Sequence, residues 1–252
     1  MEIKLKSVTY KGIADGTSLT YERCCQILSI YDLVQGLGNQ IINYKGLQEK
    51  VADESLLGYT TIGESAIRTI FPIMAKLGFV DYRGNFMAKN LFTELGHVFM
   101  NTFRALKANR EQENPNKALD IELCNCICLL KRYGILLMNG KPEYSQHGLW
   151  LACAILKKEQ IIFWPEFLFI LYLIQERSMS LEDALKQAKE NRNKHVSYDY
   201  YNDDDKPIAS TSYSYTHALL LEAGIVEDIQ TNQSRLIGGI NTYLNLMQNY
   251  YE

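Results

Sequence analysis

The sequence predicts a mainly helical α+β chain with two small β-wings, and three observations predict it. Residues 59–96 pass from a helical period through Gly78 to a short apolar strand, a turn at Arg83–Asn85 and a return strand. Residues 210–239 repeat this order about 145 residues later. The segments between these two stretches are mostly helical in period. This order is the layout of tandem winged helix-turn-helix units.

The totals describe an ordinary globular chain that is long enough for two domains. It has 252 residues, of which 47% are hydrophobic and 22% charged, and its net charge is −3. The acidic balance argues against DNA binding, although a local basic patch can still set the potential that DNA meets. No secretory signal is evident, and the most apolar run, 161–174, is too short to span a bilayer. We therefore expect a soluble, cytoplasmic chain without a membrane partner.

The first winged unit is expected to contain three helices before its wing. An edge strand over 2–10 precedes them, because apolar residues alternate there. Pro72 lies inside the third helix and predicts a bend, since proline removes a helical hydrogen bond. The three helices are expected over 19–35, 46–53 and 62–77.

The third helix and the wing carry the residues that we expect to contact DNA. In DNA-binding members of this architecture, this helix enters the major groove. Arg68 can read guanine through two hydrogen bonds, and hydroxyl side chains can hold phosphates. The plainer interpretation is that Arg68 is a solvated surface charge. The expected contacts in this unit are Thr61, Ser65, Arg68, Thr69, Arg83 and Lys89.

A helix over 93–110 follows the wing, with Thr93 as its cap and apolar residues on one face. The stretch after it is polar, lacks apolar periodicity and contains a proline, as linkers do. We therefore expect a domain boundary at 110–117. It separates an N-terminal winged-helix domain, 1–110, from a helical domain, 118–252, that ends in the second winged unit.

The second half is expected to be denser in helix and largely buried, because its helices are apolar on more than one face. Residues 193–210 are polar and acidic, which predicts an exposed loop or hairpin. Within them, 203–205 is an acidic run. Ca²⁺ loops need spaced ligands and a distal glutamate, so a solvated turn is the favoured interpretation. The helices are expected over 118–132, 145–158, 165–176 and 180–192.

The second winged unit is expected to close the chain. A Ser/Thr-rich cap leads into a helix that ends at Gly224, and a strand, a turn and a return strand follow. A last helix is expected over 240–251. By analogy with the first unit, its DNA contacts are expected at Ser212, Ser214, Thr216 and Arg235.

The cysteine spacing argues against a zinc site, and the missing motifs argue against common nucleotide-binding and catalytic sites. Cys124, Cys126 and Cys128 lie in an apolar run without the paired spacing of zinc sites, so reduced, buried core thiols are expected. The motifs G-x-x-x-x-G-K-[ST], G-x-G-x-x-G, G-x-S-x-G and H-E-x-x-H do not occur. We therefore expect no catalytic residue, no metal and no cofactor.

The stretch around the first wing resembles the winged-helix recognition subdomains of FokI-like type IIS restriction endonucleases. In those subdomains a recognition helix runs into an L-G-F-[IV]-[DE]-Y-like strand, a short wing and a T-x-x-G helix start. The nuclease domain of that family holds Mg²⁺ with two acidic residues and a lysine at strand ends. We find no such set here, so the resemblance implies recognition of duplex DNA without cleavage. The matching residues are Leu77, Gly78, Phe79, Val80, Asp81, Tyr82, Thr93 and Gly96.

Three functions remain open from the sequence. The first is sequence-specific double-stranded DNA binding, as the recognition subunit of a restriction-modification or phage-defence system or in transcription regulation. The second is a winged-helix subunit that binds a partner protein in an SMC-like or other defence or chromosome complex. The third is a small nuclease with carboxylates from the loop 199–205. The surface around 62–77 and 82–90 separates the first two, since a basic face supports DNA binding and an acidic or apolar face supports a protein partner. The oligomeric state stays open.

Overall fold

A computed structural model describes residues 2–5, 18–53, 64–139, 148–201 and 213–238. The chain is mainly helical with small sheets, as the sequence predicts. It divides into two compact units. We call residues 15–138 the first unit, and residues 139–252 together with 1–14 the second unit. The boundary therefore lies at 138/139 and not in the polar stretch 110–117, which connects two helices of the first unit.

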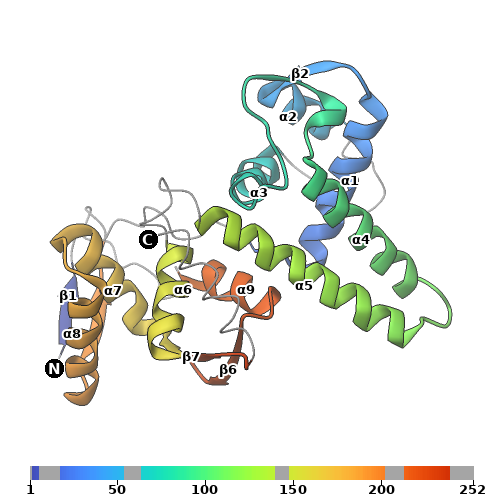
Figure 1. Ribbon diagram of the computed structural model, residues 1–252. Coiled ribbons are helices and arrows are strands. Elements are labelled where there is room, and N and C mark those ends of the chain that lie inside the picture. The colour runs from blue at the N-terminus through green and yellow to red at the C-terminus, as the bar shows by residue number, and fades with distance from the viewer. Residues whose placement is uncertain (1, 6–17, 54–63, 140–147, 202–212, 239–252) are drawn as a thin grey trace. The chain divides into compact units, whose positions relative to one another are not determined.

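The first unit places a two-stranded sheet among helices (Figure 1). Its helices α1 and α4 lie side by side, and η1 is a single 3-10 turn. All three helices expected before the wing are present. The elements are α1 (Tyr21–Leu37), β2 (Ile41–Asn43), α2 (Tyr44–Asp53), α3 (Glu64–Lys76), β3 (Asn85–Met87), η1 (Ala88–Asn90), α4 (Glu94–Arg110) and α5 (Lys117–Asn139).

The helix signals in the first unit are confirmed at both ends of the wing. Gly78 ends α3 with a φ of 77°, a left-handed conformation that glycine adopts without a steric penalty. Thr93 caps α4, because its hydroxyl accepts a hydrogen bond from the Gly96 amide at 3.1 Å. Pro72 lies within α3, as expected.

The strand pairing of the wing differs from the expectation. Residues 79–82 form no strand, and only Val80 bridges Phe92. The strand Asn85–Met87 pairs antiparallel with β2 instead, and 88–90 turn into η1 rather than extending to Leu91. The return segment thus uses a partner more than 40 residues upstream, because β2 offers it an open edge that a local hairpin would leave unpaired.

A glycine sets how closely α4 approaches the residues after α3. A Cβ atom added at Gly96 would lie 1.9 Å from the carbonyl oxygen of Phe79, which is far inside van der Waals contact. This close approach brings Phe79 and Phe99 into a stacked pair with ring centroids 4.6 Å apart. The packing of α4 against the residues after α3 therefore requires a position without a side chain at Gly96.

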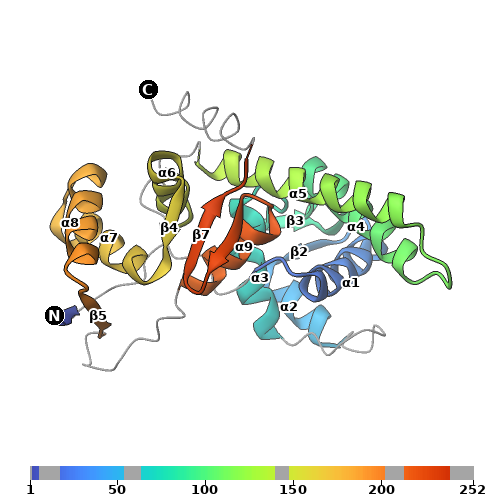
Figure 2. The same cartoon turned by 90° about the horizontal axis from the view of Figure 1, so that it is seen from below.

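The second unit contains a three-stranded sheet in the order β4-β7-β6, with α9 beside it (Figure 2). The helices expected over 145–158, 165–176 and 180–192 and the helix before Gly224 are present, and Ser180 caps α8 as predicted. The helix expected over 240–251 lies outside the described residues. A separate parallel pair joins β1 to β5, which lies in the stretch expected to be an exposed loop. The elements are β1 (Glu2–Leu5), α6 (Gly148–Glu159), β4 (Ile161–Phe163), α7 (Trp164–Arg177), α8 (Leu181–Asn193), β5 (Ser197–Tyr200), α9 (Ser214–Glu222), β6 (Val226–Gln230) and β7 (Gln233–Leu236).

The two units repeat one order of elements and the same backbone hydrogen bonds. Each runs helix, short strand, helix, a further helix, and a strand that returns to the first strand. The second unit adds α8, β5 and β6 within this order. The sequence Gln-Ile-Ile opens the first strand in both. The equivalent N–H to O=C bonds are Gly78–Ala75 (3.0 Å) and Gly224–Leu221 (2.8 Å), Phe79–Met74 (2.8 Å) and Ile225–Leu220 (2.9 Å), and Ala88–Gln40 (2.8 Å) and Leu236–Gln160 (2.8 Å).

The burial of the cysteines differs from the expectation. All six thiols are free, but only Cys24 and Cys153 are buried. Cys126 is exposed, and its neighbours Cys124 and Cys128 are half-buried. The apolar run in α5 has more than one face, and one of these faces points outward. Within the described residues, no helix is both long and apolar enough to cross a membrane.

Candidate nucleic-acid interface

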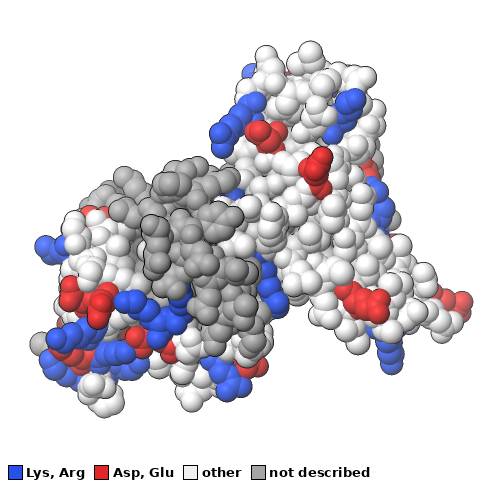
Figure 3. Space-filling view, viewed as in Figure 1, with Lys and Arg blue, Asp and Glu red and all other residues white. Residues whose placement is uncertain are grey.

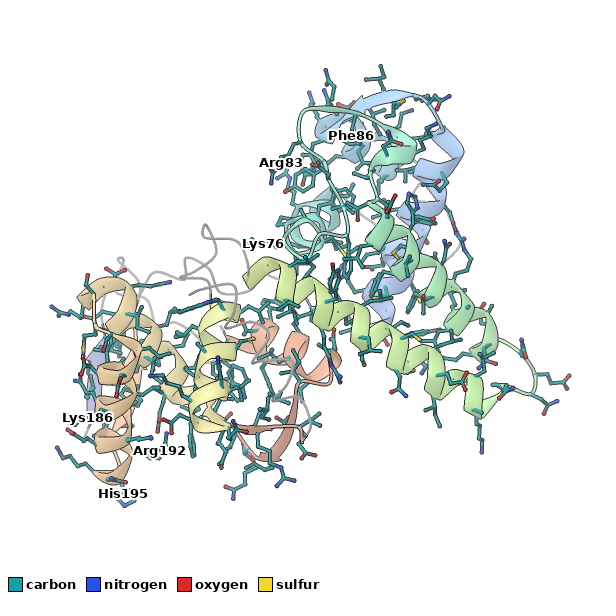
Figure 4. All side chains as sticks on the ribbon, viewed as in Figure 1. Lys76, Arg83, Phe86, Lys186, Arg192 and His195 are labelled. Carbon is teal, nitrogen blue, oxygen red and sulfur yellow. The ribbon has the colours of Figure 1, made fainter. Side chains whose placement is uncertain are left out.

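The candidate interface lies on α3 and on the turn that follows it. Arg68 is exposed on α3, and Thr69 beside it is half-buried. Lys76 at the end of α3 and Arg83 on the turn project from the same side of the first unit (Figure 4). The structure therefore brings one side chain from the end of α3 and one from the turn to one side of the unit.

An aromatic cluster supports this face. Tyr44 lies 5.1 Å from Tyr82 and 6.4 Å from Phe71 between ring centroids. Burial and the neighbouring Tyr82 raise the pKa of the Tyr44 hydroxyl, and the positive charge of Arg68 lowers it in part. Arg68 thus lies close enough to this cluster to affect it electrostatically. The rings fix α2, α3 and the turn against one another, which gives the charged side chains a rigid base.

The turn that carries Arg83 is held by its own backbone and by one carboxylate. Gly84 has a φ of 66°, which an L-residue adopts only with strain. Asp81 accepts a hydrogen bond from the Arg83 amide at 3.3 Å and so holds the start of the turn. Among the described residues, neither Arg83 nor Lys89 forms an ion pair. Both cations are exposed and able to meet an anion.

Lys89 lies on η1 beside an apolar tip. The cross-strand partners Ile41 and Met87 are exposed by 74% and 39%. Exposed apolar side chains next to a cation suit a surface that meets a partner better than one that stays in water. Lys89 belongs to the far end of the β2–β3 pair from Arg83, so the two cations flank the strand pair.

The equivalent surface of the second unit differs sharply. Thr216 is fully buried, so its hydroxyl lies in the core and not among surface contacts. Arg235 is exposed but pairs with Glu227, with 2.7 Å between Nε and Oε1. Ser214 is half-buried at the start of α9. Thr61, Ser212 and residues 202–205 of the acidic loop lie outside the described residues, as does the side chain of Ser65.

The second unit contains a polar network that sequence reasoning missed. The Trp164 indole donates to the Ser234 hydroxyl at 2.8 Å, and this hydroxyl donates to Asp228 at 2.5 Å. His217 Nε2 lies 2.8 Å from the same carboxylate oxygen and 3.2 Å from the Ser234 hydroxyl. Trp164 lies 70 residues before Ser234 in the sequence, and only the repeat between the units indicates that it shares one place with the other three.

This network is not the triad of a serine hydrolase. A triad needs the serine on one imidazole nitrogen and the carboxylate on the other. Here a single nitrogen of His217 faces both oxygens, and Ser234 is fully buried and gives its proton to Asp228. The network instead ties α9, β6 and β7 to Trp164 at the start of α7.

The charge on the visible surface is mixed. In Figure 3, the cationic side chains of the first unit are few and lie among neutral and acidic ones. Side chains of both signs gather over α7 and α8 in the second unit. The face shown carries no continuous basic stripe among the residues that are described, in agreement with the net charge of −3.

Comparisons with protein families, with curated proteins and with solved structures found no match to this chain.

Proposed function

We propose that this chain binds double-stranded DNA through the first unit and that both units are winged helix-turn-helix modules. The observation that carries the proposal is the exposed Arg68 on α3, on the same unit as Arg83 and Lys89, which are also exposed. In such modules the helix at the position of α3 enters the major groove, and the wing contacts the backbone. The resemblance to FokI-like recognition subdomains supports the same assignment.

In this proposal the three cations have different tasks. Arg68 reads a base edge, because arginine can give two hydrogen bonds to guanine O6 and N7. Arg83 and Lys89 neutralise phosphates on either side of the groove, which positions the unit without reading sequence. The few cations and the net negative charge predict modest affinity with a small salt dependence, since each neutralised phosphate adds about 0.9 to the slope of log K against log salt.

The role that fits this chemistry is target recognition. The chain would act in the cytoplasm as the recognition subunit of a restriction or phage-defence system, or as a regulator of transcription. None of these tasks requires catalysis by this chain.

The test is selection from random duplexes at low salt, followed by titration of the selected sequence. Arg68→Ala should weaken binding to that sequence by about 1–3 kcal/mol and relax the preference at one base pair. Arg83→Ala and Lys89→Ala should each weaken binding to all sequences alike and lower the slope of log K against log salt by about 1. Lys186→Ala, on the exposed side of α8, is the matched control and should change neither. Absence of duplex binding by the wild type at low salt would end the DNA proposal.

One observation favours the alternative that this chain is a subunit that binds another protein. The helix α5 exposes Ile121, Leu129 and Tyr133 by 61%, 59% and 49%, and these residues are separated by eight and by four positions, which are multiples of the i, i+4 spacing. Large apolar side chains in such a stripe are typical of a surface that another protein covers. Under this alternative, DNA binding is absent and Leu129→Asp releases the partner from purified complexes.

A further inference from the structure

The second unit contains a cavity of about 200 Å³ between α6, β4, α7 and the inserted helix α8. Its apolar wall comes from all four elements, through Ile155, Ile161, Ile170, Leu185 and Ala188. Two acid–base pairs line the rest of it. Apolar surface with a few convergent charged groups is the usual composition of a small-molecule site.

The inner pair joins α7 to α8. Glu166 is buried, and it accepts two hydrogen bonds from Arg192, at 2.7 Å from Nε and 2.6 Å from Nη2. The Arg192 guanidinium also lies over the Phe163 ring, 3.5 Å from its centroid. These contacts use one edge of the guanidinium, and the Nη1 protons are left for a further acceptor.

The outer pair lies at the more exposed end of the cavity. Lys189 and Glu159 are 2.6 Å apart, and their side chains are exposed by 50% and 26%. An exposed pair of this kind contributes little to stability, so its members can exchange partners at small cost. Figure 4 shows Arg192 on the side of α8 toward α6, whereas Lys186 lies on another side of the same helix.

The charges select the class of ligand. A simple carboxylate would be attracted by Arg192 and Lys189 but repelled by the two glutamates. A simple amine would be attracted by the glutamates but repelled by the two cations. A zwitterion places its carboxylate toward the two cations and its ammonium toward Glu159 and Glu166. Its apolar part then fills the wall of isoleucine and leucine. A 150 Å³ apolar cavity holds a ring the size of benzene, so a cavity of this volume suits a molecule of about nine heavy atoms.

We propose that this cavity binds a small zwitterion with an apolar side chain, the chemistry of an aliphatic α-amino acid. The proposal concerns the second unit alone and is independent of DNA binding by the first. Because the cavity forms only where α8 covers β4 and α7, the inserted helix would be the element that a bound ligand stabilises.

Calorimetric titration of the full chain with L-leucine tests this, with 4-methylpentanoate and 3-methylbutylamine as probes that each lack one charge. Leucine should bind, and each single-charge probe should bind about tenfold or more weakly, since a buried charge then loses its partner. Lys189→Ala should weaken leucine binding by a similar factor. Lys186→Ala, on the same helix but outside the cavity, should leave leucine binding unchanged.

A filled cavity gives a second, independent test. Ala188→Phe occupies the space and should abolish leucine binding while the circular dichroism spectrum stays the same. If this variant does not fold, the paired lysine variants still decide. The proposal is overturned if leucine does not bind, if leucine and the two single-charge probes bind equally, or if Lys186→Ala and Lys189→Ala weaken leucine binding alike.

Discussion

The helices α3 and α9 occupy equivalent places in the two units, yet they present opposite chemistry. The shared hydrogen bonds at Gly78 and Gly224 align them residue by residue. In this alignment, Arg68 of α3 corresponds to Ser214 of α9, and Lys76 corresponds to Glu222. The backbone scaffold is thus repeated while its outward charge is not. The order of elements therefore predicts where a contact surface lies, and the side chains determine what that surface can contact.

The interior beneath these helices has diverged in the same way. In the first unit, the positions next to the sheet form an aromatic cluster, and in the second unit the equivalent positions form the hydrogen-bonded network around Asp228. One cluster is held by apolar contact and the other by polar bonds, so the two units should respond differently to mutation and to pH. The equivalent pairs are Tyr44 and Trp164, Phe71 and His217, Tyr82 and Asp228, and Phe86 and Ser234.

The largest effect on stability is expected at Gly96, and it should be confined to the first unit. Gly96→Ala should destabilise that unit by about 3 kcal/mol or more, because the new Cβ meets the Phe79 backbone. Gly36→Ala is the control: it adds a Cβ in open space within α1 and should stabilise by about 0.5–1 kcal/mol. Urea unfolding followed by circular dichroism measures both. Equal effects of the two variants would contradict the packing described for α4.

The next effect concerns the polar network, and it should appear only in the second unit. Ser234→Ala leaves the buried Trp164 indole without an acceptor and should cost about 1–3 kcal/mol. Trp150 and Trp164 are the two tryptophans of the chain and both belong to the second unit. Tryptophan fluorescence during urea unfolding therefore reports on this unit. A shift in the unfolding of the first unit instead would show that the clusters are not independent.

A pH dependence should separate the two clusters. Burial raises the pKa of Asp228, but hydrogen bonds from Ser234 and His217 and the charge of His217 outweigh it, so the pKa is lowered. A lowered pKa stabilises the folded state above the ordinary value near 3.8, and this stability is lost as the pH falls through the folded value. The second unit of Asp228→Asn should therefore lose less stability than wild type between about pH 5 and 3. Tyr82→Phe should leave this slope unchanged.

The smallest effect is expected at Arg235. Its pairing with Glu227 is exposed, so Arg235→Ala should change stability by less than about 0.5 kcal/mol. It should also leave duplex binding unchanged, in contrast to Arg83→Ala, because Glu227 already neutralises it. Filter binding of the two variants side by side checks this. A salt slope lowered equally by both would make the second unit a DNA-binding module as well.

Local signals predicted much of the fold, and non-local pairing accounts for most of the rest. Gly78 and Thr93 set helix ends through their own conformation and hydroxyl, so the sequence suffices for them. The strand 85–87 had two possible partners, and its alternation cannot choose between them. The polar stretch 110–117 is typical of a linker, yet Arg110 and Asp120 pair across it at 2.6 Å and close a turn between helices.

The candidate site shows the same limit. Arg68 could be predicted as an exposed cation because it lies off the apolar face of its helix, and Arg83 because it lies in a turn. Thr216 was expected on the surface for its hydroxyl, but it recurs with Leu219 and Leu220 on the apolar face of α9. The cavity beside α8 could not be predicted, because its walls come from four elements that meet only in the folded chain.

The pairing of β1 with β5 gives the molecule an order of events during synthesis. Residues 2–5 leave the ribosome before the first unit, but their partners at 197–200 follow almost 200 residues later. At about 5–20 residues per second, this strand waits roughly 10 to 40 s for its partner. The first unit is complete well before then and can fold while the strand is still unpaired. The second unit thus pairs a strand made before the first unit with a strand made after it.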